Sequence, residues 1–292
     1  MLDPVIRQLM HAHIQEKTHP IEPIITGVSA VIHHIPDIRC VAFDVYGTLL
    51  VSAAGEVGTT DDLAKTPHSF ISTAHRLGIP SQQVAPLAQS FYQMIRAYHH
   101  HARERGIQYP EVDVRSIWRD VMDTWDVLGS ITPEEIALAH ELEANPVWPM
   151  PGARSVIESL RSRGLRLAIV SNAQFYTPLI LEALLGTTLD ALSLHPQIWS
   201  FEIGVAKPSP VPFRALQEKL SDEGIDPGQT LYVGNDMLND VVTSQDQGFK
   251  TVLFAGDARS LRWRNDRAEI RACTPDGVIT DLTQLASIVT SQ

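Results

Sequence analysis

The sequence has little of several features that mark special classes of protein. It holds only two cysteines, Cys40 and Cys273, which lie far apart and without metal-ligand spacing. They indicate a reducing compartment and no disulfide framework. No apolar run is long enough to span a bilayer, and the first residues lack the basic start and apolar stretch of a secretory signal. We therefore expect a cytoplasmic protein with no membrane contact.

Positive charge is also scarce. The formal net charge is -11, with 23 lysine and arginine residues against 34 aspartate and glutamate residues. This balance argues against general nucleic-acid binding. It suits an enzyme that holds a cation and admits a small anionic substrate at one local site. Internal repeats and low-complexity tracts are absent too, and the hydrophobic fraction of 44% is typical of a globular chain with a sizeable core.

The most informative stretch is CVAFDVYGTLL, residues 40–50. Its apolar run predicts a short buried strand that ends at Asp44, with Gly47 in the turn that follows. An ionised carboxylate at the end of a buried strand is costly unless it has a partner or a task. Open α/β sheets bind their ligands at this edge. We therefore expect Asp44 to be a nucleophile on which the other functional residues converge.

The chain divides into three parts. Residues 1–37 predict an N-terminal extension packed on the main domain. Residues 51–149 contain helical stretches and no strong strand pattern, which predicts an all-helical inserted domain. In 150–292 strands alternate with helices, and together with 38–50 this predicts an α/β core domain. Such alternation is typical of a Rossmann-like, doubly wound parallel sheet covered on both faces.

Individual elements follow from the periodicity. The first predicted helix is 3–16, and one face of it carries Val5, Ile6, Leu9, Met10 and His13. The insertion predicts helices over 69–76, 81–105, 114–127 and 133–144. The core predicts strands over 165–170, 192–194, 230–233, 251–254 and 277–280, and helices that include 153–163, 238–247 and 282–289. Thr132 and Pro133 are a helix-start signal with Glu135 in the first turn.

Polar residues follow three of the predicted strands, and one lysine lies in a loop between them. They are Asp44 with Thr48, Ser171 with Asn172, Lys207, and Asp236 with Asp240. Singly, each has an ordinary explanation as a turn, a helix cap or a surface charge. Together they line one crevice, because parallel strands bring their carboxyl ends to one edge. Carboxylates there suit Mg²⁺, which offsets the repulsion between an attacking aspartate and a phosphoryl group.

These motifs, in this order, resemble those of the haloacid dehalogenase superfamily of hydrolases. The resemblance covers about residues 40–285 and places the helical insertion, as a cap, between the first and second motifs. It is carried by Asp44-Val45-Tyr46-Gly47-Thr48-Leu49, Ser171-Asn172, Lys207-Pro208 and Gly234-Asn235-Asp236-Met237-Leu238-Asn239-Asp240. It implies Asp44 as the nucleophile, Ser171 as a phosphate-binding hydroxyl and Lys207 as the charge stabiliser.

The resemblance also implies a magnesium site and a substrate site. Mg²⁺ would be held by Asp44, by the backbone carbonyl of Tyr46 and by Asp236. Asp240 would be a further ligand, or would orient Lys207 and the water on the metal. The residues that bind the phosphate or substrate would be Gly47, Thr48, Ser171, Asn172 and Lys207.

Two positions depart from the family pattern. Phosphatases of this family usually carry a second aspartate, the general acid and base, where this chain has Tyr46. A phenol with an ordinary pKa of ~10 is a poor base at neutral pH. The usual Gly-Asp of the last motif is Gly234-Asn235 here, and Asp236 follows. Glu111 or Asp113, in a predicted loop of the insertion, are candidates for the missing acid.

Four functions remain open at this stage. A magnesium-dependent phosphatase acting on a small phosphate ester is favoured. The Asp-x-Tyr-Gly-Thr-Leu motif also resembles that of 2-haloacid dehalogenases, which need no metal, but Asp236 and Asp240 would then repel an anionic substrate. A phosphonoacetaldehyde hydrolase would need a lysine in the insertion, where Lys65 is the one lysine. The fourth alternative is a binding or regulatory module, in which Tyr46 would indicate a catalytic site that is disabled.

One stretch of positive charge stands out in the acidic chain. Acidic residues interleave with this stretch, which favours a surface or oligomer contact over polyanion binding. A homo-oligomer is therefore one of the expected possibilities. The members of the stretch are Arg259, Arg262, Arg264, Arg267 and Arg271.

Overall fold

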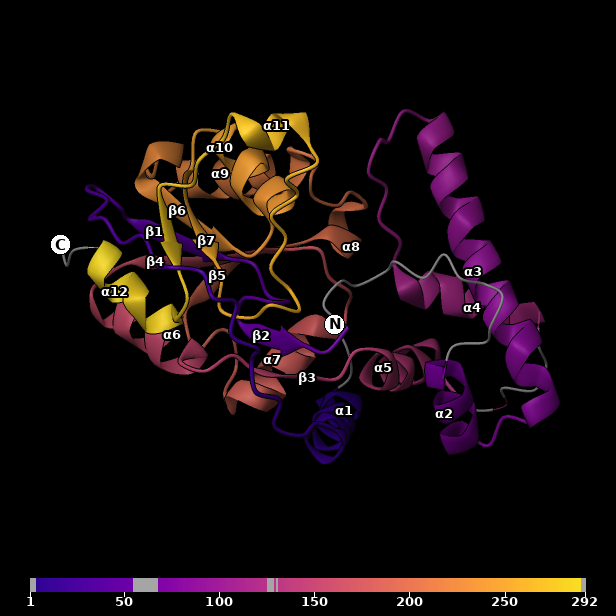
Figure 1. Ribbon diagram of the computed structural model, residues 1–292. Coiled ribbons are helices and arrows are strands. Elements are labelled where there is room, and N and C mark those ends of the chain that lie inside the picture. Colours follow the sequence, from indigo (N-terminus) through magenta and orange to yellow (C-terminus); the bar gives the residue numbers. More distant parts are fainter. Residues whose placement is uncertain (1–3, 55–67, 125–128, 130, 290–292) are drawn as a thin grey trace.

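The structure is a computed structural model that describes residues 4–54, 68–124, 129 and 131–289 (Figure 1). A six-stranded parallel sheet forms its centre, with the strand order β5-β4-β1-β6-β7-β8. These strands are β1 Cys40–Phe43, β4 Arg166–Ser171, β5 Leu194–Trp199, β6 Thr230–Gly234, β7 Lys250–Phe254 and β8 Gly277–Ile279. The strand order reverses between β1 and β6. This is the doubly wound, Rossmann-like α/β fold that the sequence predicts.

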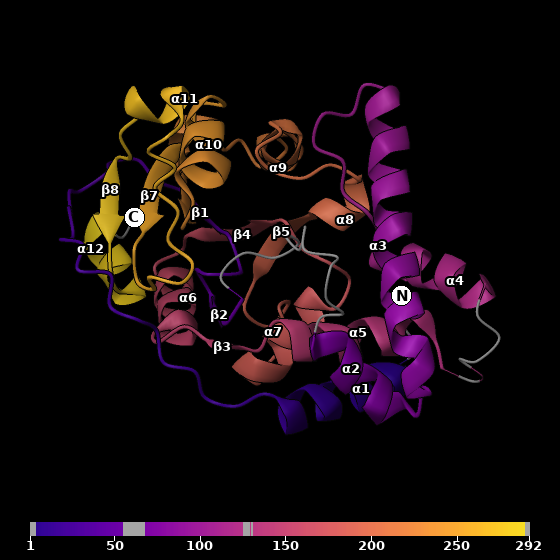
Figure 2. The same cartoon turned by 45° about the vertical axis from the view of Figure 1, so that its right-hand side comes forward.

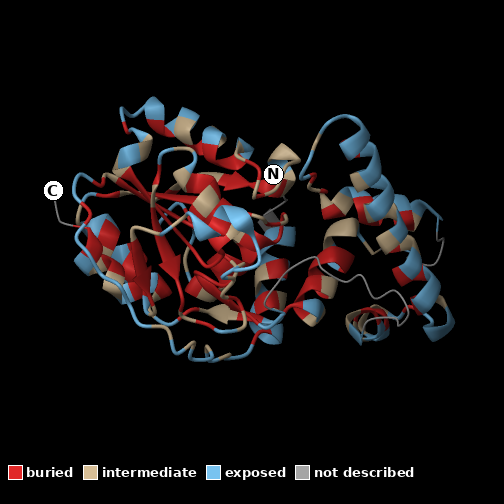
Figure 3. Cartoon of the chain, turned by 45° about the horizontal axis from the view of Figure 1, so that its top comes forward, coloured by how far each residue is buried: buried red, intermediate tan, exposed pale blue. Residues whose placement is uncertain are grey.

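Strand β1 is buried on both faces, as its unbroken apolar sequence requires. Val41 and Phe43 pack into one cluster, which includes residues of α6 and α12, while Cys40 and Ala42 pack into another with residues of α9. Figure 3 shows the strands buried between exposed outer helix faces. The helices of the core are α6 Ala153–Ser162, α7 Thr177–Leu185, α8 Ser200–Ile203, α9 Val211–Ser221, α10 Thr243–Gln245, α11 Ala268–Arg271 and α12 Leu285–Ile288.

In the described part of the chain, four helices come between β1 and β4 in sequence. The views agree that these helices stand beside the main sheet (Figures 1 and 2). They are α2 His68–Leu77, α3 Ser81–Glu104, α4 Val114–Thr124 and α5 Pro133–Ala144. Helix α5 begins with the predicted cap, since Thr132 accepts from the Glu135 N–H and the Glu135 side chain accepts from the Thr132 N–H. Residues 125–127 of the predicted third helix, and Lys65, lie outside the described residues.

Two short strands join these helices to the core, and the sequence analysis wrongly expected none in this segment. Strands β2, Leu50–Ser52, and β3, Val147–Pro149, pair antiparallel, with Val51 opposite Trp148. Three residues are too few for a period-two pattern to be recognised. Pairing brings the two ends of the insertion together directly after the Asp44 loop.

The N-terminal helix docks through a different face from the one expected. Helix α1, Pro4–Lys17, buries Met10 and Ile14, whereas Ile6 and Leu9 are exposed. The half-exposed Arg7 also forms an ion pair with the Glu182 carboxylate of α7, and an exposed pair contributes little to stability. The docked face is therefore the one that carries Met10 and Ile14. None of the described helices has the length and apolarity needed to span a membrane.

Three predicted core elements differ in extent or type. The strand expected at 192–194 is β5, which begins at Leu194 and continues through Pro196 to Trp199. The helix expected at 238–247 is a π-helical segment, Met237–Val242, followed by the short α10. The last helix begins with a 3₁₀ turn, Leu282–Gln284, before α12. Proline within a strand and i→i+5 hydrogen bonds are both uncommon, so hydrophobic periodicity does not predict them.

Candidate active site

Asp44 lies one residue beyond β1, at the point where the strand order reverses. Its N–H donates to the Val233 carbonyl of β6, which extends the parallel pairing to the sheet edge. Three later N–H groups, those of Thr48, Leu49 and Leu50, donate hydrogen bonds to the Val45 carbonyl and so form a tight turn. The Asp44 carboxylate is therefore presented at the crevice where open α/β sheets bind ligands.

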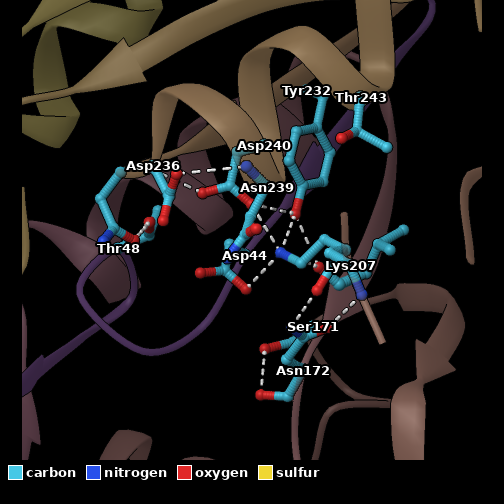
Figure 4. Close-up of polar contacts among 12 residues, drawn as sticks. Asp44, Thr48, Ser171, Asn172, Lys207, Tyr232, Asp236, Asn239, Asp240 and Thr243 are labelled. Carbon is cyan, nitrogen blue, oxygen red and sulfur yellow. Dashed lines mark hydrogen bonds and ion pairs between the residues drawn. The ribbon is translucent and has the colours of Figure 1, made fainter. Parts of the chain in front are cut away.

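Lys207 is the centre of the site (Figure 4). Its Nζ lies 2.9 Å from Asp44 Oδ1, 2.6 Å from Asp240 Oδ1 and 2.8 Å from the Tyr232 hydroxyl. A fourth contact, of 3.3 Å, reaches the Val170 carbonyl of β4. Burial lowers the pKa of Lys207, but the two carboxylates outweigh burial, and the pKa is raised above its ordinary value. The ammonium is therefore charged and bridges two acids.

Asp240 is a buried acid with a strongly perturbed proton affinity. Its Oδ1 accepts from Lys207, and its Oδ2 accepts from the Asp236 N–H at 2.9 Å. Burial raises its pKa to about 7, Lys207 opposes that rise, and the charges of Asp44 and Asp236 add to it. Gly234 makes room for this side chain, because a Cβ there would lie 2.4 Å from Asp240 Oδ2.

Asp236 is held by an arginine that the sequence analysis missed. Its Oδ2 accepts from Arg264 Nη2 at 2.7 Å and from Arg264 Nε at 3.1 Å. Its Oδ1 accepts from the N–H groups of Leu238 and Asn239, as an N-cap does. The expectation that the arginine stretch forms only a surface or oligomer contact is therefore wrong for Arg264. The sequence feature that could have pointed to Arg264 is the arginine stretch itself, which stands out as positive charge in an acidic chain.

Asn235 ties the Asp44 loop to the loop that carries Arg264. Its Oδ1 accepts from the Thr48 hydroxyl at 3.1 Å, and its Nδ2 donates to the Ser260 carbonyl at 2.7 Å. Thr48 is fully buried, so its hydroxyl serves the loop in this structure. Gly47 has a φ of 81°, and a Cβ there would lie 2.5 Å from Ser260 Cβ. These residues thus set the shape of the Asp44 turn.

Gly47→Ala is expected to destabilise the protein by about 3 kcal/mol, because it combines a left-handed backbone with a steric clash. Gly164→Ala is a matched control, since Gly164 has a φ of 79° and nothing within 4 Å of an added Cβ. The control is expected to cost about 1 kcal/mol. Urea unfolding of both variants measures the difference. Equal losses would show that the close approach to Asn235 and Ser260 is unimportant.

Ser171 is the last residue of β4 and Asn172 follows it, and both lie beside Lys207 as expected (Figure 4). Asn172 Oδ1 accepts from the Lys207 N–H at 2.7 Å, and its Nδ2 donates to the Lys207 carbonyl at 3.0 Å. Asn172 therefore fixes the backbone of the lysine. Among the described residues, the Ser171 hydroxyl has only a long contact, of 3.4 Å, to the Asn172 carbonyl, so it is available for a stronger acceptor.

Tyr46 is partly buried and keeps its proton at neutral pH. Its hydroxyl lies 3.0 Å from Thr177 Oγ1. Burial raises the pKa of Tyr46 well above its ordinary value, and the charges of Glu141 and Asp44 add to that rise against the Thr177 hydrogen bond. This phenol therefore cannot act as a general base near neutral pH.

Glu111, one of the two acids proposed as substitutes with Asp113, is hydrogen-bonded to residues of the core. Its Oε2 accepts from the Ser200 hydroxyl at 2.8 Å and its Oε1 from Gln174 Nε2 at 3.2 Å. Burial raises its pKa to about 7, opposed by the hydrogen bonds from Ser200 and Val112. Asp113 instead pairs with Arg115. Glu111 thus joins the helical insertion to α8, which begins directly after β5, and to the segment that follows β4.

The raised pKa of Glu111 predicts a pH-dependent stability. The unfolded protein loses this proton near the ordinary pKa of 4.5 and the folded protein near 7. Glu111 therefore costs stability progressively as the pH rises from about 4.5 to about 7. Glu111→Gln removes that loss. The melting temperature of this variant minus that of the unsubstituted protein should therefore increase as the pH rises from about 4.5 to about 7. Glu218→Gln, at an exposed position, is the control, and parallel melting curves for all three proteins would contradict the assignment.

The expected magnesium ligands fit the ion in kind. Among the described residues, no three His, Cys, Asp or Glu side chains form a metal-binding group by themselves. Mg²⁺ requires fewer, since it keeps several waters and takes one or two carboxylates. Asp44, Asp236 and Asp240 supply such carboxylates, and Asp44 Oδ2 accepts no hydrogen bond from the described part of the chain.

Comparisons with known proteins show the family of the chain. A family model described as haloacid dehalogenase-like hydrolase matches residues 38–243, and the chain belongs to this family. The mouse haloacid dehalogenase-like hydrolase domain-containing protein 3 is 27% identical over 198 residues, covering 64% of this chain and 74% of the relative. A glyceraldehyde 3-phosphate phosphatase of Pyrococcus abyssi is 28% identical over 163 residues, covering 49% of this chain and 66% of the relative.

Solved structures share the fold. The crystal structure of a 2-haloacid dehalogenase from Pseudomonas syringae superposes with a TM-score of 0.51 at 19% identity, covering 85% of this chain and 96% of the other. The protein is therefore an enzyme of the hydrolase class with the architecture of this family.

Proposed function

We propose that the protein is a magnesium-dependent phosphatase that acts on a small phosphate ester through Asp44. The observation that carries this proposal is the bridge from Lys207 to Asp44 and Asp240, which leaves Asp44 Oδ2 without a hydrogen bond from the described residues. The relatives named glyceraldehyde 3-phosphate phosphatase support a phosphate ester over a halide.

Each residue then has a chemical role. Asp44 Oδ2 attacks phosphorus, the ester oxygen leaves, and an aspartyl-phosphate forms. Lys207 holds Asp44 through its Oδ1 and offsets the charge of the phosphoryl oxygens, while the Ser171 hydroxyl donates to one of them. Asn172 keeps the lysine in place. Water later cleaves the aspartyl-phosphate and regenerates Asp44.

The metal site would be made by the Asp44 carboxylate, the Tyr46 carbonyl and Asp236, with Asp240 as a further ligand or as the residue that orients Lys207. The Mg²⁺ ion would offset the repulsion between the attacking carboxylate and the substrate. Tyr46 stays protonated, so it leaves the proton-transfer step to another group. We propose Glu111, whose pKa burial raises to about 7, as a candidate for this step.

We infer the domain roles from the same arrangement. Residues 51–149 form a cap that selects the substrate, 38–50 and 150–292 form the hydrolase core, and 1–37 are an extension of that core. The antiparallel pairing of β2 with β3 supports this division, because it attaches both ends of the helical segment to the core directly after the Asp44 loop. We also propose a cytoplasmic location, on the strength of two free cysteines.

A second candidate is a metal-independent hydrolase of the 2-haloacid dehalogenase kind. The ion pair between Asp236 and Arg264 favours it. Both acids that would repel an anionic substrate have a counter-ion, since Asp240 pairs with Lys207 and Asp236 with Arg264. Repulsion of a substrate carboxylate is thereby reduced.

A substrate screen separates the two candidates. Phosphate esters, with glyceraldehyde 3-phosphate among them, and 2-haloacids are each tested with Mg²⁺ and with chelator. The proposal predicts phosphate release that requires Mg²⁺ and is lost in Asp44→Asn. Release of halide in the presence of chelator would overturn it in favour of the second candidate.

A further inference from the structure

Arg264 makes a close, directed contact with the acid expected to bind the metal. Its Nη2 donates to Oδ2 of Asp236 at 2.7 Å, and its Nε lies 3.1 Å from Oδ2 and 3.4 Å from Oδ1. The Asp236 side chain is 8% exposed and that of Arg264 is 26% exposed. An ion pair shielded from solvent in this way is screened less by salt than a surface pair.

The backbone delivers the arginine to this place. The Met237 N–H donates to the Arg262 carbonyl, and the Arg262 N–H donates to the Asn235 carbonyl, so the two segments pair like parallel strands. Asn235 Nδ2 holds the Ser260 carbonyl of the same loop. Arg264 itself has a φ of 51°, in the left-handed region that non-glycine residues seldom adopt. The strained arginine is therefore held by bonds from the motif that supplies Asp236.

The N-terminal extension anchors the start of this loop. The Asp257 carboxylate accepts from the Ile24 N–H at 3.1 Å, and the Ala258 N–H donates to the Ile24 carbonyl at 2.8 Å. Asp257 is almost completely buried and also pairs with Arg259. Two sequence features without an assigned role, residues 1–37 and the arginine stretch, thus meet at the loop beside the site.

Asp236 cannot serve the arginine and a metal ion together. Its Oδ1 is committed to the N–H groups of Leu238 and Asn239, and its Oδ2 to Arg264. The carboxylate cannot turn away from the helix start without losing both cap bonds. A divalent cation on Oδ2 would also lie within a few ångströms of the guanidinium, where like charges repel.

We propose that Arg264 is an internal competitor for the metal ion at Asp236. It neutralises Asp236 in the metal-free enzyme, and it must leave that carboxylate before Mg²⁺ binds. Arg264 therefore sets the Mg²⁺ concentration at which the site fills. This inference rests on the magnesium site of the proposed function.

The test is calorimetric titration of Mg²⁺ into the full-length protein without substrate. Arg264→Gln removes the competing charge and is expected to bind Mg²⁺ roughly tenfold more tightly, because the fraction of protein competent for binding rises. Arg267→Gln is the matched control. It makes the same charge change at an exposed position of the same loop and is expected to leave the affinity unchanged.

A second readout follows the arginine itself in the unsubstituted protein. Phenylglyoxal modification of Arg264, quantified by peptide mass spectrometry, is expected to become faster when Mg²⁺ is saturating. Equal or weaker Mg²⁺ binding by Arg264→Gln, no binding by either protein, or protection of Arg264 by Mg²⁺ would overturn the proposal. Because no substrate is present, these results are separate from the presence or absence of phosphatase activity.

Discussion

Asp44→Asn should lower kcat/KM for a phosphate ester by roughly 10⁴-fold or more while the protein stays folded. The amide oxygen of asparagine is a far weaker nucleophile than a carboxylate, and catalysis through a covalent intermediate fails without it. Folding is expected to survive, since Lys207 keeps its contacts with Asp240 and the Tyr232 hydroxyl. Steady-state kinetics and a thermal unfolding curve measure the two effects separately.

The comparison needs two further variants. Asp44→Ala guards against slow deamidation of asparagine back to aspartate, and it should be equally inactive. Asp222→Asn makes the same chemical change at an exposed position of the core and should retain full activity. A residual rate in Asp44→Ala within about tenfold of the unsubstituted enzyme would rule out Asp44 as the nucleophile.

The second large effect is expected at Lys207. Lys207→Met removes the ammonium that bridges Asp44 and Asp240, and the methionine side chain can replace only its packing. Two buried carboxylates then face each other without a counter-ion, which should cost about 3–5 kcal/mol of unfolding free energy. Activity should fall to background as well, because the charge opposite the phosphoryl oxygens is lost.

The destabilisation should depend on pH in a predictable direction. Asp240 already has a pKa of about 7 with the lysine present, and loss of the lysine removes the interaction that lowers it. Below about pH 6 the acid takes up a proton and the repulsion is relieved, so the loss of stability should be smaller there than at about pH 8. Urea unfolding at both values, with the exposed Lys219→Met as control, measures this. The same loss at both pH values would contradict the bridging role.

Much of the fold could be predicted from local patterns. The unbroken apolar run before Asp44 and the alternation of strands and helices after residue 150 indicate a parallel sheet, and the sheet order is as expected for a doubly wound fold. The strand ends also bring Asp44, Ser171, Asn172, Lys207 and Asp240 together. Sequence motifs suffice here because a parallel sheet fixes where its carboxyl ends lie.

The remaining features depend on contacts that no local pattern encodes. Arg264 reaches Asp236 through a left-handed backbone and a loop pairing between residues 235 and 262. The side chain of Asp236 is divided between a helix cap and that arginine, whereas its position in the motif suggests only a metal ligand. Tyr46 finds its partner, Thr177, on a helix that lies 131 residues further along the chain. Such pairings are decided by tertiary packing.

The covalent intermediate gives the most direct test of the central claim that Asp44 is the nucleophile of a phosphatase. The enzyme is mixed with a reactive phosphate ester and Mg²⁺, quenched in acid within one turnover, and digested for mass spectrometry. The account predicts that the peptide containing Asp44 gains the mass of one phosphoryl group, that hydroxylamine removes it, and that the Asp44→Asn enzyme shows none. Phosphate release with no modification of that peptide at any quench time, or a phosphoryl group on another residue, would contradict the account.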